Sequence, residues 1–81
     1  MEIDYSVEAS RALRRCDKRK LVRDKIELLA RDPLALSANV KKLSGVDEYR
    51  LRVQNWRILF VFADGILKIK DILPRGSAYE D

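Results

Sequence analysis

Two short connections in the C-terminal half determine most of what this chain can fold into. Gln54-Asn55 and Asp64-Gly65 separate three segments, about 48–53, 56–63 and 66–73, in which apolar residues alternate with polar ones. Alternation with a period of two indicates strands, and Asp-Gly is a strong signal for a two-residue hairpin turn. Gln-Asn is a weaker signal, acceptable because asparagine tolerates a positive φ. The sequence therefore predicts two consecutive antiparallel hairpins.

The N-terminal half has a helical period instead. Glu2–Tyr5 alternates and is predicted to form a short first strand, and Ser6 is a suitable N-cap for the helix that follows. A second helix, capped by Asp17, ends at Asp32-Pro33 because the residue before a proline disfavours helical backbone. The apolar residues recur at helical spacing: Ala9, Ala12, Leu13 and Cys16 in the first helix, and Leu21, Val22, Ile26, Leu28 and Leu29 in the second.

These elements predict one α+β domain over residues 1–81 with the order β-α-α-β-β-β. The helical hairpin is expected to pack on one face of a small, mainly antiparallel four-stranded sheet. Residues 34–43 show no clear period, and we treat them as a connector with room for a short helical turn.

If both turns hold two residues, the cross-strand pairs can be counted, and opposed residues share a face. The core face then collects Tyr49, Leu51, Val53, Trp56, Ile58, Phe60, Phe62, Leu67 and Ile69. The opposite face, here called the cationic face, collects Arg50, Arg52, Arg57, Lys68 and Lys70, with Leu59, Val61 and Ile72 between them. Asp71 falls on the core side in this register, which predicts a bulge or strand end near it.

The cationic face has two interpretations. Most half-buried sheets have a solvated polar face, but such a face usually mixes charges of both signs. Here Arg52 stands directly opposite Arg57, a like-charge pair that sheets normally avoid. Neighbouring positions are about 5–7 Å apart, close to the spacing of phosphates along a nucleic-acid strand. The pattern therefore favours a polyanionic partner, in keeping with the net charge of +4.

Several chemistries are excluded by what the sequence lacks. It has no histidine and one cysteine, Cys16, so it cannot form a His-based triad, an internal disulfide or a zinc site of the usual ligands. Its three glycines are scattered singly, so there is no glycine-rich phosphate loop. We expect no metal and no cofactor. No apolar run is long enough to span a membrane, and the start of the chain is no signal peptide, so a cytoplasmic protein is expected.

Four segments in residues 42–79 resemble the RelE/ParE superfamily of toxins from type II toxin–antitoxin modules. They are Lys42-Leu43-Ser44-Gly45, Tyr49-Arg50-Leu51-Arg52-Val53, Trp56-Arg57-Ile58-Leu59-Phe60 and the tail from Leu73 to Tyr79. The resemblance implies a RelE-like fold and a cognate antitoxin as partner. RelE-type members enter the ribosomal A site and cut mRNA there, whereas ParE-type members share the fold and inhibit DNA gyrase.

For a RelE-type enzyme we expect a catalytic set of Arg52, Arg57, Arg75 and Tyr79. Arg52 and Arg57 can stabilise charge at the phosphate, and the resemblance implies roles for Arg75 and Tyr79. We also expect RNA contacts from Arg50, Lys68, Lys70 and Lys42. The ribosome-dependent archetype has lysines at the positions of Arg50 and Arg52, one of them the proposed general base, and arginine is a poor base. The identity of the base therefore stays open.

Three functional hypotheses follow: an mRNA endonuclease that inhibits translation on the ribosome, a ParE-like protein that inhibits gyrase by binding, and a family member that only binds its antitoxin. The predicted helical hairpin is also rich in cations: Arg11, Arg14, Arg15, Lys18, Arg19, Lys20, Arg23 and Lys25. They form either a solvated helix face or a docking surface for the 16S rRNA of the ribosome. Trp56, Tyr49, Tyr5 and Cys16 are expected to be packing residues.

Overall fold

Both helices begin and end where local side-chain chemistry allows it. In the computed structural model, which describes residues 1–76, strand β1 (Glu2–Tyr5) leads into helix α1 (Val7–Arg15). The hydroxyl of Ser6 accepts a hydrogen bond from the Ala9 N–H at 2.9 Å and donates one to the Lys70 carbonyl at 2.6 Å, so this N-cap also ties α1 to the sheet. Helix α2 (Arg19–Arg31) stops before Pro33, as predicted.

Asp17 does not cap α2, and that prediction was wrong. The N-cap is Lys18, whose side chain makes no capping hydrogen bond. The Asp17 carboxylate instead accepts a hydrogen bond from the indole Nε1 of Trp56 at 3.2 Å. This contact with a residue distant in sequence takes the carboxylate away from the helix end.

The sheet has five strands rather than the predicted four. Its order is β1-β5-β4-β3-β2, with β3 (Tyr49–Val53), β4 (Trp56–Ala63) and β5 (Ile66–Pro74) forming the two predicted hairpins. The connector contains a short 3₁₀ turn (Ser37–Asn39) followed by β2 (Val40–Lys42), the additional strand. Only β1 pairs in parallel, against β5, and the other neighbours are antiparallel. Three residues are too few for β2 to show a period in the sequence.

The first hairpin has the predicted register, and the second has it only in part. All five β3–β4 pairs agree, including Arg52 opposite Arg57. The β4–β5 pairs agree from Ala63 to Phe60, after which a bulge shifts the register so that Leu59 faces Asp71. Lys70 is the extra residue. The prediction beyond Phe60 was therefore wrong.

This bulge decides which β5 residues reach the core. Ile72 was expected on the cationic face, but it pairs with Ile58 and is 2% exposed, packed in the core. Asp71, expected on the core side, is half-buried opposite Leu59, and its carboxylate accepts a hydrogen bond from the Ile72 N–H at 2.8 Å. A bulge near Asp71 was anticipated because a carboxylate has no place in an apolar core.

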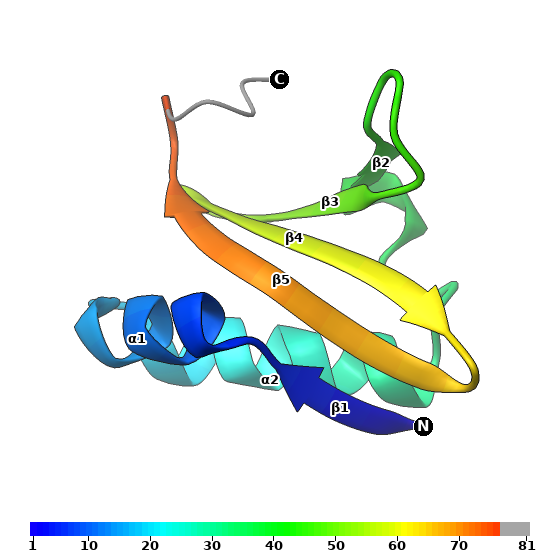
Figure 1. The fold of residues 1–81 in the computed structure, drawn as a ribbon. Helices are drawn as coiled ribbons and strands as arrows, with labels where there is room; N and C mark the ends of the chain where they lie inside the picture. The colour runs from blue at the N-terminus through cyan, green and yellow to red at the C-terminus, as the bar shows by residue number, and fades with distance from the viewer. Residues whose placement is uncertain (77–81) are drawn as a thin grey trace.

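The core lies between the sheet and the two helices, which cover the same face (Figure 1). Phe60 is fully buried at its centre, and its ring stacks on Tyr49 with centroids 5.7 Å apart. Trp56, Tyr49 and Tyr5 pack against this core, and Cys16 is buried within it, as predicted. Burial raises the pKa of the Cys16 thiol, which keeps it protonated at neutral pH. No helix within residues 1–76 is long and apolar enough to cross a membrane.

Candidate nucleic-acid interface

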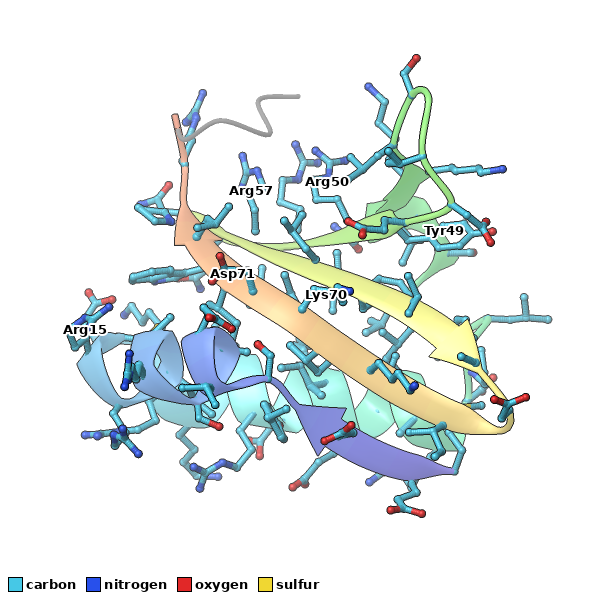
Figure 2. All side chains as sticks on the ribbon, viewed as in Figure 1. Arg15, Tyr49, Arg50, Arg57, Lys70 and Asp71 are labelled. Carbon is cyan, nitrogen blue, oxygen red and sulfur yellow. The ribbon has the colours of Figure 1, made fainter. Side chains whose placement is uncertain are left out.

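The β3–β4 hairpin places three arginines on the side of the sheet that faces away from the helices. Arg52 pairs with Arg57, and Arg50 is two residues before Arg52 on the same strand, so all three share one face. Figure 2 shows Arg50 and Arg57 projecting from that face. On β5, Lys68 pairs with Val61 on the same side of the sheet, whereas Lys70 is the extra residue of the bulge, where the alternation of sides is interrupted. The register thus places Arg50, Arg52, Arg57 and Lys68 on one face, and it places Asp71, opposite Leu59, on that face as well.

Burial divides these residues into two groups. Arg50 and Arg57 are 7% and 6% exposed, and Leu59 beside them is also buried. Arg52 and Lys70 are exposed, and Lys68 is half-buried. Buried charges are weakly screened by salt, whereas exposed ones are screened within about 10 Å at 0.1 M. The cationic face therefore combines two buried, poorly screened guanidinium groups with more exposed cations around them.

Arg57 is held by the turn that precedes it. Its Nη1 donates to the carbonyl of Gln54 at 2.9 Å and to that of Trp56 at 3.2 Å. Gln54, rather than Asn55, adopts the positive φ of this turn, at 53°. The same turn also binds the segment after β5, because the Arg75 N–H donates to the Asn55 carbonyl at 2.7 Å. One two-residue turn therefore fixes both the Arg57 guanidinium and the backbone of Arg75.

The arginines of the cationic face disfavour one another's positive charge. The pKa of Arg50 lies below its ordinary value, first because of burial and then because of the positive charges of Arg57 and Arg52. A lowered arginine pKa means that the surroundings disfavour its charge. A bound anion, placed among these guanidinium groups, would relieve that repulsion, and guanidinium forks match phosphate oxygens in two-point contacts.

The like-charge pair gives a prediction about stability. Replacing Arg52 by glutamine is expected to raise the free energy of unfolding by about 0.5 kcal/mol at low salt, because opposed like charges on neighbouring strands repel. The gain should shrink at high salt, which screens exposed charges. Urea unfolding at two salt concentrations measures both effects. Arg11→Gln, at an exposed position on α1, is the control and should bring no gain. A loss of stability for Arg52→Gln at low salt would contradict the prediction.

Lys42, predicted to contact RNA, lies apart from the cationic face. It pairs with Tyr49, whose ring belongs to the core side, and its Nζ is 4.0 Å from the Asp47 carboxylate. The neighbouring Lys41 pairs with Arg50 and is exposed, so Lys41 extends the row of cations instead. Sequence reasoning missed Lys41 because β2 was not identified, and without a register the faces of residues 40–42 cannot be assigned.

The other predicted residues are placed as follows. Arg75 is exposed directly after β5. Tyr79 lies outside the described residues, so its predicted role is not tested. The helical-hairpin cations lie on α1, α2 and their connection. Of these, Arg15 on α1 lies on the other side of the sheet from Arg50 (Figure 2). Among residues 1–76, no group of His, Cys, Asp and Glu side chains is arranged to hold a metal ion.

Comparison with solved structures identifies the architecture. The isolated Escherichia coli RelE toxin superposes with a TM-score of 0.75 at 18% identity, covering 95% of this chain and 86% of that one. This chain has the RelE fold. YafQ from E. coli BL21(DE3) gives 0.73 at 20% identity, over 90% of this chain and 91% of that one. A chain of the RelBE2 toxin–antitoxin complex from Mycobacterium tuberculosis gives 0.67 at 22% identity, over 91% and 96%.

The match to known RelE proteins lies in the structure and not in overall sequence similarity. No protein-family model and no curated protein matches the sequence. At 18–22% identity, the likeness extends to nearly the full length of each chain, so the five-stranded sheet, the two helices and the β3–β4 hairpin of this protein belong to one shared architecture.

Proposed function

We propose that this protein is the toxin of a type II toxin–antitoxin module and that it cuts mRNA on the ribosome. The observation that carries the proposal is the clustering of Arg50, Arg52 and Arg57 on the helix-free face of a RelE fold. A sheet built only for stability gains nothing from opposed arginines, because like charges on neighbouring strands repel, whereas a polyanion that binds across them lowers that repulsion.

The chemistry needed is strand cleavage at a phosphate. The ribose 2′-oxygen attacks the adjacent phosphorus, its proton leaves to a base, and the bond from phosphorus to the 5′-oxygen breaks as that oxygen takes up a proton. Negative charge accumulates on the phosphate oxygens in the transition state, and preorganised cations stabilise it. Arg57, fixed by two carbonyls of its turn, and the exposed Arg52 opposite it suit this role. We assign arginine to charge stabilisation and not to proton removal, because its pKa is too high for a base.

Arg75 and Tyr79 complete the proposed catalytic set. Arg75 corresponds to the arginine that RelE-type enzymes use near the leaving oxygen, and its backbone is tied to the β3–β4 turn. Tyr79 corresponds to the C-terminal tyrosine that stacks on or orients the substrate base. Arg50, Lys68 and Lys70 are proposed to hold the flanking phosphates, through contacts that do not depend on base sequence.

We also propose a cognate antitoxin as the partner. It is supported by the RelE fold shared with chains of solved toxin–antitoxin complexes, among them RelBE2 of M. tuberculosis. An acidic antitoxin segment would complement the cationic face, and its affinity should then weaken as salt increases. A small antitoxin-like reading frame beside that of this protein would identify the candidate to test.

Primer extension on a defined mRNA translated by purified ribosomes tests the proposed activity. Adding the protein is expected to cut the mRNA at the same position within successive codons, which primer extension detects as new 5′ ends. The same RNA without ribosomes should stay intact. Intact mRNA together with stalled gyrase would contradict the proposal and favour ParE-like inhibition. Intact mRNA and active gyrase would favour a protein that only binds its antitoxin.

A further inference from the structure

A hollow of about 610 Å³ lies where three connections meet at one end of the sheet. The α1–α2 connection contributes Asp17 and Lys18, the β3–β4 turn and the start of β4 contribute Asn55 and Trp56, and the end of β5 contributes Pro74 and Arg75. Its volume is within the range of small-molecule binding sites. Among these residues, only Arg75 belongs to the proposed catalytic set.

The lining combines three kinds of group. Trp56 and Pro74 supply an aromatic ring and an aliphatic ring, Asn55 supplies an amide, and the exposed Lys18 and Arg75 supply two positive charges. Stacking on an aromatic ring, hydrogen bonds to base edges and cations for phosphate are the means by which proteins hold single-stranded nucleic acid.

Asp17 and Trp56 determine each other's position at this site. The indole Nε1 donates to the Asp17 carboxylate at 3.2 Å, and Trp56 also packs against the core, so its ring is restrained on two sides. Asp17, the acidic residue among the described residues that line the hollow, is therefore engaged with the indole. A restrained ring loses little conformational entropy when a base stacks on it.

The hollow adjoins the cationic face. The Trp56 carbonyl accepts a hydrogen bond from Arg57, and Arg75 is bound through its N–H to Asn55. If one phosphate of an RNA strand binds at Arg57, the neighbouring nucleotide of that strand therefore lies at the end of the sheet, next to the hollow.

We propose that this hollow is a nucleotide subsite for single-stranded RNA. One base stacks on Trp56, and the phosphate of that nucleotide is contacted by Lys18 and Arg75. The inference rests on the proposed RNA-binding function of the cationic face and adds to it a base-binding position outside that face.

Trp56 is the only tryptophan of the chain, so its fluorescence reports on this position alone. The probe is a short single-stranded oligoribonucleotide with 2′-O-methyl riboses, which cannot be cut by 2′-oxygen attack. It is expected to quench the tryptophan fluorescence with the same midpoint as its binding measured by anisotropy of an end label. Lys18→Ala should weaken binding by about tenfold, as expected for the loss of one charge-assisted contact.

Lys20→Ala is the matched control, an exposed lysine nearby on α2 whose partner is Asp24 and which does not line the hollow. It should leave affinity and quenching nearly unchanged. Binding seen by anisotropy with no change in tryptophan fluorescence, and with Lys18→Ala equal to wild type, would overturn the subsite and leave RNA binding by the cationic face standing. No binding of the oligonucleotide to the wild-type protein would overturn both.

Discussion

Replacing Arg57 by alanine is expected to lower the rate of mRNA cleavage on the ribosome by about 100-fold or more. Arg57 is 6% exposed, and its guanidinium is oriented by the carbonyls of Gln54 and Trp56, so its charge is already in place before the transition state forms. Losing one preorganised group that stabilises developing negative charge typically has an effect of this size. Single-turnover cleavage, followed by primer extension over time, measures it.

Two further variants separate a catalytic effect from a folding effect. Arg57→Lys keeps the charge and loses the planar fork, so activity between wild type and Arg57→Ala is expected. Arg31→Ala removes an exposed arginine in the last turn of α2 and should leave cleavage unchanged. Thermal unfolding of each variant checks that it is folded. A folded Arg57→Ala protein that cuts mRNA at the wild-type rate would contradict the proposed role.

Replacing Phe60 by alanine is expected to have the largest effect on stability, a loss of about 3–5 kcal/mol. Phe60 is 0% exposed. The centroid of its ring is 5.7 Å from that of Tyr49 on the neighbouring strand β3 and 5.4 Å from that of Phe62 on its own strand. A chain of this length has only a few kcal/mol to lose, because small domains bury less surface for each residue. The variant should therefore be largely unfolded at 37 °C.

Phe62→Ala is the natural control because it removes the same side chain two residues later on the same strand. Phe62 is 42% exposed, so this change should cost less than half as much. Urea unfolding gives the free energy of unfolding of Phe62→Ala, and the folded fraction of Phe60→Ala without urea, measured by circular dichroism, gives that of the other variant. Equal losses for the two variants would contradict the position of the core between the sheet and the helices.

The predicted hairpins were correct because their signals are local. Asp64-Gly65 adopts positive φ at both residues, and the β3–β4 register, including Arg52 opposite Arg57, follows from counting outward from a two-residue turn. The position of Arg50, Arg52 and Arg57 on one face of the sheet could therefore be predicted from the sequence alone.

The errors occurred where contacts distant in sequence decide the structure. Strand β2 exists because residues 40–42 pair with β3, not because those residues show a pattern of their own. The β5 bulge brings Ile72 into the core, and Asp17 contacts Trp56 instead of capping α2. Each outcome depends on the packed structure. The misfit of Asp71 indicated a bulge near it, but local propensity carries no signal for β2, for the shifted pairs of Ile72 or for the Asp17 contact.

The central claim is that RNA phosphates bind among Arg50, Arg52 and Arg57 on the helix-free face. The most direct measurement is an NMR titration of ¹⁵N-labelled protein with the 2′-O-methyl oligonucleotide, following backbone amides and arginine Nε–H signals. The claim predicts that the largest shifts fall on β3, β4 and the Arg50 and Arg57 side chains, and that they diminish with salt. Shifts confined to α1 and α2, with the β3 and β4 signals unchanged, would contradict it.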